Sequence, residues 1–79
     1  MDKKSPKVAN IEQAIRRYLL MHPQAIDTER GIREWWLRDV RPRPLSADVH
    51  EAIESLVAAG GLARRTLPDG QHGYALPEP

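Results

Sequence analysis

The hydrophobic period of this chain changes once, at the adjacent glycines Gly60 and Gly61. Before them, apolar residues recur every three or four positions, as they do on the buried face of a helix. After them, two short segments, 62–67 and 71–76, flank the sequence Pro-Asp-Gly at 68–70. These three residues in this order supply the backbone angles of a tight reversing turn and predict a β-hairpin. The chain is therefore expected to adopt an α+β fold in which helices precede a single hairpin.

Apolar residues at helical spacing predict a first helix that starts at or shortly after Ser5. Serine followed by Pro6 is a typical capping and first-turn pair, because the serine oxygen accepts from an early amide and proline has no amide hydrogen to satisfy. His22 precedes Pro23 and is pushed out of the α region, which ends the helix there. The predicted buried face consists of Val8, Ile11, Ile15, Tyr18 and Leu19.

A second helix is predicted over residues 28–38. Asp27 and Thr28 are both able to cap it, and Glu29 in its first turn suits the positive end of the helix dipole. Gly31 costs about 1 kcal/mol relative to alanine inside a helix, which favours close packing against a neighbouring helix at this position. On a helical wheel, one apolar stripe contains Ile32, Trp35 and Trp36.

Pro42 and Pro44 separate the second helix from a third one. The segment 39–45, which contains both, is predicted to be stiff and extended, because proline fixes φ and cannot donate a hydrogen bond. Ser46 is the predicted cap of the third helix, and the glycine pair at 60–61 ends it, as residues that tolerate the left-handed region do. The predicted buried face of this helix comprises Val49, Ile53, Leu56 and Val57.

This order of elements resembles the winged helix-turn-helix family. The resemblance rests on the run from the third helix into the hairpin: Val49, Ile53, Leu56, Gly60-Gly61-Leu62, Arg64-Arg65, Asp69-Gly70 and Tyr74-Ala75-Leu76. It covers a single domain over residues 8–76, with 1–7 as a flexible basic arm and 77–79 as a short tail. It implies that the third helix is a recognition helix and that the hairpin is a wing, closed onto the helices by Tyr74 and Leu76. The long segment with two prolines departs from the tight turn that is usual in this family.

Charge is distributed unevenly along the chain, although the formal net charge is only +1. Residues 1–45 carry ten Lys and Arg against six Asp and Glu, whereas residues 46–59 carry Asp48, Glu51 and Glu54 and no Lys or Arg. A recognition helix reads base edges with Arg, Lys, Asn or Gln, and the predicted exposed face of the third helix has none of them. Three carboxylates would also approach the phosphates, so docking of this helix in the major groove is disfavoured.

The basic residues lie outside the third helix, and they lead to our first functional prediction. The chain is expected to be a small transcriptional regulator that contacts the backbone of double-stranded DNA through the proline-containing segment, the wing and the N-terminal arm. An ordinary solvated surface, with some arginines paired to Glu34 or Asp39, is the alternative explanation of this charge. The residues expected to contact DNA are Arg38, Arg41, Arg43, Arg64, Arg65, His72, Lys3, Lys4 and Lys7.

A protein-interaction adaptor that does not bind DNA is the second functional prediction. An acidic third helix beside a basic segment suits a partner with complementary charges, and a homodimer is a special case. Leu20 and Leu37 fall off the apolar stripes of their helices, and one of the two tryptophans is expected to be only partly covered. Tryptophan and arginine are the residue types that most often anchor interfaces. The residues assigned to this surface are Asp48, Glu51, Glu54 and Trp36.

Catalysis is the least expected class of function. The chain has no cysteine, no nucleophile elbow and no glycine-rich phosphate loop between a strand and a helix. His50 and Glu54 are four residues apart, which offers two metal ligands without a third. No catalytic residue, metal or cofactor is therefore assigned. No apolar run is long enough to span a membrane and no secretory leader is recognised, so a cytoplasmic protein is expected.

Overall fold

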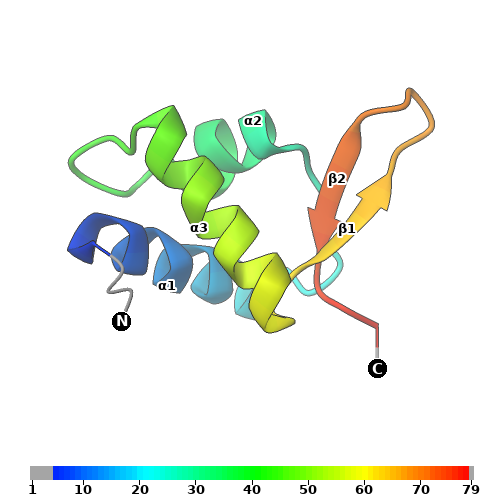
Figure 1. Ribbon diagram of the computed structural model, residues 1–79, viewed down its shortest axis with the longest axis horizontal. Helices are drawn as coiled ribbons and strands as arrows, with labels where there is room; N and C mark the ends of the chain where they lie inside the picture. The colour runs from blue at the N-terminus through cyan, green and yellow to red at the C-terminus, as the bar shows by residue number, and fades with distance from the viewer. Residues whose placement is uncertain (1–4, 79) are drawn as a thin grey trace.

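The computed structural model describes residues 5–78, which form three helices followed by one hairpin (Figure 1). Its elements are α1 (Pro6–Met21), α2 (Glu29–Gly31), η1 (Ile32–Trp36), α3 (Ser46–Ala59), β1 (Ala63–Thr66) and β2 (His72–Ala75). α2 and η1 follow each other without a break and together make the second helix. The predicted α+β order of elements is confirmed, and it is consistent with a winged-helix-like topology.

Helix α1 begins and ends where the local sequence indicates. Ser5 is its N-cap, and the serine oxygen accepts a hydrogen bond from the amide of Val8 at 3.2 Å. Pro6 follows in the first turn. At the other end, His22 donates its amide to the carbonyl of Tyr18 at 2.8 Å and closes the last turn. Both ends of this helix are therefore set by residues next to them in the sequence.

The second helix differs from its prediction in its length and in the face that it buries. η1 is a π-helical segment, in which the amide of Leu37 donates to the carbonyl of Ile32, five residues back, at 3.1 Å. This wider turn rotates the residues that follow relative to an α-helix. Trp36 and Leu37 are therefore buried, whereas Trp35 is 62% exposed. Ile32 and Trp36 of the predicted stripe are buried as expected, whereas the predicted burial of Trp35 and the outward position of Leu37 are wrong. The helix ends at Trp36, two residues before its predicted end.

The side chains of Thr28 and Asp27 each accept a hydrogen bond from a backbone amide at the start of α2. The Thr28 hydroxyl caps the helix by accepting from the amide of Gly31 at 3.1 Å. The Asp27 carboxylate accepts from the amide of Thr28 at 2.8 Å. A Cβ atom on Gly31 would overlap with the Asp27 carboxylate. The glycine makes room for this side chain, and the predicted reason, close packing against a neighbouring helix, is wrong.

The connector between the second helix and α3 spans residues 37–45 and forms a wide loop at the end of the molecule farthest from the hairpin (Figure 1). Leu45 is the N-cap of α3, and no side chain caps this helix. Ser46 is its first helical residue, so the predicted capping role of Ser46 is wrong. Gly60 ends α3 with a φ of 83°, in the left-handed region that glycine adopts without strain.

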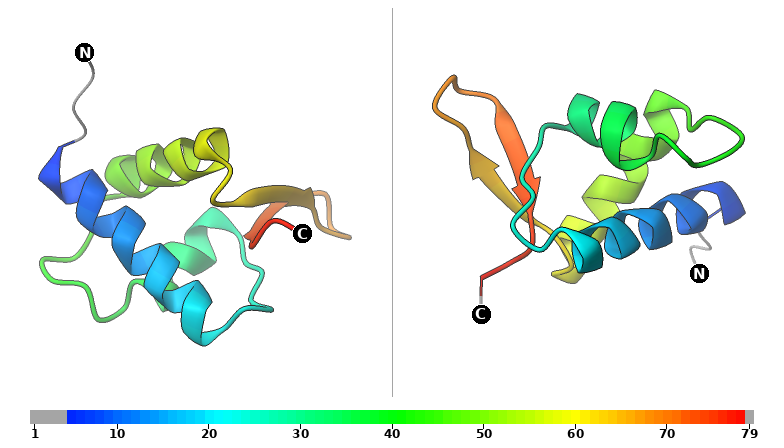
Figure 2. Two further views of the ribbon diagram at one scale, coloured as in Figure 1. Left: turned by 90° about the horizontal axis from the view of Figure 1, so that it is seen from below. Right: turned by 180° about the vertical axis from the view of Figure 1, so that it is seen from behind.

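The hairpin pairs β1 with β2 in antiparallel register, with Arg64 opposite Tyr74. The predicted turn is confirmed: the amide of Gly70 donates to the carbonyl of Leu67 at 2.9 Å, and Gly70 has a φ of 89°. On its other edge β2 forms a one-residue bridge, in which Tyr74 and Asp27 exchange two backbone hydrogen bonds at 2.8 and 3.2 Å. The bridge fastens the loop before α2 to the hairpin (Figure 2).

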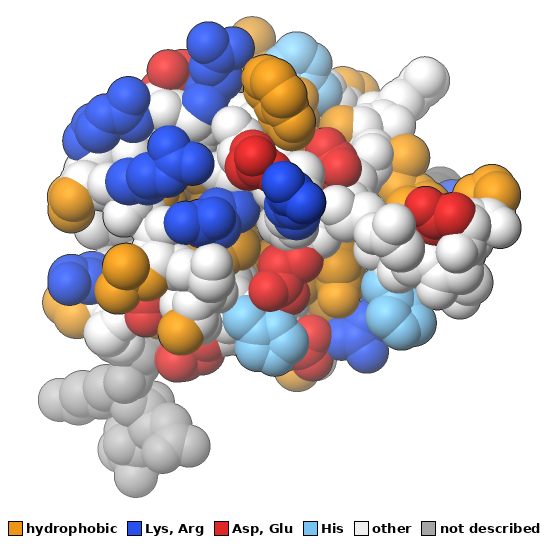
Figure 3. Space-filling model, turned by 90° about the horizontal axis from the view of Figure 1, so that it is seen from above, with side chains coloured by type: hydrophobic (Ala, Val, Ile, Leu, Met, Phe, Trp, Pro, Cys, Tyr) orange, Lys and Arg blue, Asp and Glu red, His pale blue; other side chains and the backbone are white. Residues whose placement is uncertain are grey.

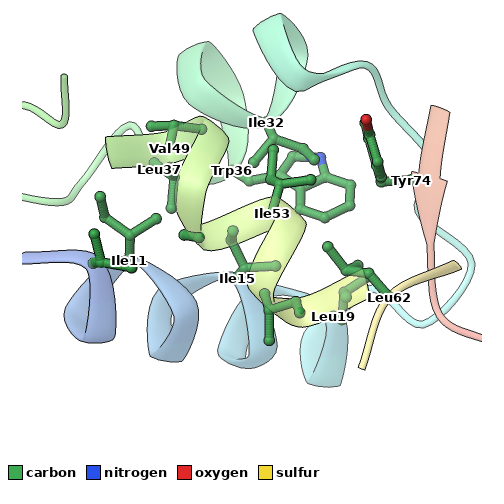
Figure 4. Packing of buried hydrophobic residues seen from close by; sticks show 13 residues of the cluster. Ile11, Ile15, Leu19, Ile32, Trp36, Leu37, Val49, Ile53, Leu62 and Tyr74 are labelled. Atoms are coloured by element: carbon green, nitrogen blue, oxygen red, sulfur yellow. The ribbon is translucent and has the colours of Figure 1, made fainter. Parts of the chain in front are cut away.

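The core lies where α1, the second helix and α3 meet, and side chains from all three helices point into it (Figure 4). Its labelled members are Ile11, Ile15 and Leu19 from α1, Ile32, Trp36 and Leu37 from the second helix and its end, Val49 and Ile53 from α3, and Leu62 and Tyr74 from the hairpin region. Leu76, expected to close the hairpin, is 37% exposed, so Leu62 and Tyr74 make that contact. The three helices are thereby fixed relative to one another and to the hairpin.

Candidate interaction surfaces

The exposed face of α3 carries carboxylates that are engaged unequally. Glu54 accepts a hydrogen bond from the guanidinium of Arg64 on β1, with 2.5 Å between Nη2 and Oε2. This hydrogen bond to a carboxylate raises the pKa of Arg64 above its ordinary value. Asp48 and Glu51 have no ion-pair or hydrogen-bond partner among residues 5–78. Arg64, one of the wing arginines assigned to DNA, is therefore paired with α3, and its side chain remains 38% exposed.

His50 joins α3 to the second helix. Its Nδ1 lies 2.9 Å from a carboxylate oxygen of Glu29, in the first turn of α2. The hydrogen bond to this carboxylate, together with its charge, raises the pKa of His50 above the ordinary value of 6.5. The two side chains that the sequence places four residues apart, His50 and Glu54, therefore bind different partners. Within residues 5–78, no group of three or more His, Asp and Glu side chains is arranged to hold a metal ion.

The remaining wing residues assigned to DNA are exposed. Arg65 donates to Glu78 at 3.1 Å; the Arg65 side chain is 41% exposed and that of Glu78 is 76% exposed. His72 is exposed at the start of β2. Exposed ion pairs of this kind contribute about 0–1 kcal/mol, so this pair is easily exchanged for another partner. The charge of the whole surface therefore matters more than the individual pair: residues 46–78 contain five carboxylates and two arginines.

A basic surface, opposite in charge to that of α3 and the hairpin, lies on the second helix and the connector. Figure 3 looks onto this side of the molecule and shows Lys and Arg side chains gathered over the half formed by these elements. Residues 30–43 contain five arginines against two carboxylates. We call this set the basic face: Arg30, Arg33, Arg38, Arg41 and Arg43.

The arginines of the basic face differ in their contacts. Arg30 forms an ion pair with Glu34 at 2.8 Å, and residues four positions apart are neighbours on a helix surface. Arg41 donates to the carbonyls of Arg38 and Val40, at 2.6 and 3.0 Å, which folds its side chain back onto the connector. The side chains of Arg38 and Arg43 have no partner among the described residues. The structure thus brings the three predicted connector arginines together and leaves two of them available.

The tryptophan assigned to the protein-interaction surface lies in the core. Trp36 is 7% exposed and stacks on Tyr18, with ring centroids 4.8 Å apart. The assignment of Trp36 is therefore wrong, and Trp35 is the tryptophan at the surface. Lys7 lies in the first turns of α1 rather than in an arm, and Lys3 and Lys4 fall outside the described residues. The sequence contained a signal for the burial of Trp36, because Trp36 follows Ile32 by four residues and lies on the same apolar stripe.

Comparison of this chain with models of known protein families, with curated proteins and with solved structures found no match. None of the helices described over residues 5–78 is long and apolar enough to cross a membrane. What the protein binds is therefore inferred from its surfaces.

Proposed function

We propose that this chain is a winged-helix domain that binds another protein through the exposed face of α3. The observation that supports this proposal is the acidic charge of the surface built by α3 and the hairpin, with five carboxylates and two arginines over residues 46–78. In the winged-helix family, which the order of elements resembles, this surface would face the duplex. DNA carries one negative charge per ~1.7 Å of helix axis and would be repelled, whereas a cationic protein surface would be attracted.

Asp48 and Glu51 form the centre of the proposed contact. They are three residues apart on α3, which places their side chains on neighbouring turns, with Cβ atoms about 5–6 Å apart. A rigid helix holds this spacing before the partner arrives, so little conformational entropy is lost on binding. Two carboxylates at this spacing suit arginine side chains, whose guanidinium groups form paired hydrogen bonds with a carboxylate. The partner is accordingly a protein with an arginine- or lysine-rich surface.

The test compares two charge reversals by cross-linking in living cells and quantitative mass spectrometry. Glu51→Lys reverses a charge on α3, and Asp39→Lys makes the same change on an exposed carboxylate of the connector. A protein captured by the wild type and by Asp39→Lys but lost with Glu51→Lys supports the proposal. Purified, that protein should bind Glu51→Lys at least about tenfold more weakly than the wild type. If no captured protein distinguishes the two variants, the α3 face is not the binding surface.

A second candidate function is DNA binding through the basic face, in the role of a small transcriptional regulator. It is favoured by the two connector arginines without a partner among the described residues, Arg38 and Arg43, and by the exposed Trp35 on the second helix. Contacts of this kind reach phosphates and not bases, so the affinity should fall steeply with salt. A titration of backbone amides with a short mixed-sequence duplex, at low and at physiological ionic strength, tests it. Salt-sensitive shifts at 38–43 would support this candidate, and unchanged spectra at low salt would eliminate it.

A further inference from the structure

A groove runs between α1 and the connector, along most of the length of α1. It consists of two adjacent hollows of about 260 and 300 Å³, one along each half of α1, and Val40 lines both. Figure 2 shows the connector beside the N-terminal half of α1 in both of its views. Between residues 7 and 21, α1 is about 21 Å long at 1.5 Å per residue. One face of the helix lines the groove, with members three or four residues apart: Lys7, Ile11, Ala14, Tyr18 and Met21.

The floor of this α1–connector groove is apolar. Val40 and Tyr18 are half-buried, and the Tyr18 ring rests on the buried Trp36 in a nearly parallel stack, at 10° between planes. Large apolar side chains stand exposed at both ends of the groove: Met21 is 74% exposed and Leu45 is 62% exposed. Apolar side chains aligned along a hollow, and not scattered singly, are typical of surfaces that another molecule covers.

The rim of the groove is cationic. Lys7, Arg17, Arg41 and Arg43 line the two hollows, against Asp39 and Asp48. Arg41 is held in position by its two hydrogen bonds to connector carbonyls. A ligand that fits this groove must therefore carry an apolar strip flanked by negative charge. Nucleic acid satisfies the charge but offers no regularly spaced aliphatic groups for the floor.

We infer that the α1–connector groove binds an acidic amphipathic helix from a partner protein. A helix of about 14 residues matches the length of the groove, and apolar side chains three or four residues apart on that helix would enter the two hollows in turn. Its flanking carboxylates would meet the cationic rim. This site lies apart from the proposed contact on α3, except that Asp48 stands at one end of the groove. The groove takes an acidic partner, whereas the α3 face takes a cationic one, so the chain could join two proteins of opposite charge.

The experiment uses a synthetic helical peptide of about 14 residues, with leucine every three or four positions and glutamate elsewhere. A second peptide of the same composition has its leucines spread around the helix. Each is titrated into the isotope-labelled full chain, and the backbone amide shifts are followed. The first peptide should shift amides along α1 and the connector, and the rearranged peptide should bind at least about tenfold more weakly, because it presents no apolar strip.

Charge variants separate the groove from the general basicity of this side of the molecule. Lys7→Glu with Arg43→Glu reverses two rim charges, and it should weaken the peptide by about tenfold or more. Arg30→Glu with Arg38→Glu is the matched control, because it also reverses two charges and both residues are exposed but line neither hollow. It should change the affinity by less than about twofold. Ala14→Trp fills one hollow from the helix side and should abolish binding, with circular dichroism reporting whether each variant is folded.

Three results would overturn this inference. Equal binding of the two peptides would show that charge alone attracts them. The same conclusion would follow if the control reversals weakened the peptide as much as Lys7→Glu with Arg43→Glu does. Shifts centred on α3 or the hairpin would place the peptide elsewhere. Displacement of the peptide from the groove by a short DNA duplex at lower concentration would assign the rim to nucleic acid. Glu51→Lys should bind the peptide as the wild type does, so failure of the α3 proposal would leave this result intact.

Discussion

Leu37 and Trp35 are two residues apart at the end of the second helix, and replacing Leu37 with alanine should cost more stability than replacing Trp35. Leu37 is 1% exposed and belongs to the core cluster, whereas Trp35 is 62% exposed. The π-helical hydrogen bond between Leu37 and Ile32 produces this difference by rotating the end of the helix. The pair of variants therefore tests the helix geometry and the composition of the core together.

The expected magnitudes follow from burial. Removing three buried carbon atoms in Leu37→Ala should cost about 3 kcal/mol, within the usual range of about 2–5 kcal/mol for buried leucines. A domain of this size has a free energy of unfolding of about 4–12 kcal/mol, so this loss is a large share of the total. Trp35 is 62% exposed, so about a third of a tryptophan surface of about 250 Å² is buried. At about 25 cal/mol per Å², its truncation should cost at most about 2 kcal/mol.

Urea denaturation followed by far-UV circular dichroism measures both effects. With a slope near 1 kcal/mol per molar, the midpoint should fall by about 3 M for Leu37→Ala and by at most about 2 M for Trp35→Ala. Thermal melts should show the same order, because about 1 kcal/mol corresponds to 4–8 °C in a domain of this size. Equal losses, or a larger loss for Trp35→Ala, would mean that the helix continues without the π turn and buries Trp35.

Three further changes test the local contacts. Gly31→Ala should destabilise the fold by about 1 kcal/mol in urea denaturation, because the new methyl group displaces the Asp27 carboxylate from its hydrogen bond to Thr28. This loss outweighs the gain in helix propensity, and it should disappear when Asp27 is also alanine. Arg64→Ala leaves the α3 face more acidic, so this variant should bind an oligolysine peptide about two- to threefold more tightly than the wild type in calorimetry. Unchanged affinity would count against the proposed α3 surface. The raised pKa of His50 means that the folded state holds the imidazole proton more tightly than the unfolded state does. The contribution of the His50–Glu29 pair to the free energy of unfolding is therefore fully present below about pH 6.5, and it is lost as pH rises through the folded pKa. Thermal melts of Glu29→Gln and the wild type should therefore differ in acid and converge in base, and a gap that does not depend on pH would contradict this.

The acidic face of α3 and the basic segment before it could be predicted from the sequence. Helical periodicity places Glu51 on the side opposite Ile53 and Leu56, and the absence of Lys and Arg between residues 46 and 59 is a property of composition. The contacts of these charges could not be predicted. Arg64 meets Glu54 because β1 returns beside α3, and neither the direction of that return nor its distance is encoded in the spacing of residues.

The sequence by itself determined those features that depend on residues a few positions apart. The cap at Ser5, the end of α1 before Pro23 and the turn at 68–70 each follow from the conformational limits of single residues, which act in the same way in any fold. Local preferences of this kind need no distant partner, so they survive intact into the folded structure.

The tertiary structure alone decided which apolar residues of the second helix are buried and where the grooves lie. An α turn and a π turn after Ile32 differ little in local hydrogen bonding, and the choice depends on which side chains fill the space between α1 and α3. Filling that space with Trp36 and Leu37 leaves Trp35 in solvent and sets the connector beside α1. The α1–connector groove results from this packing, because the space between elements is a property of their arrangement and not of any one segment.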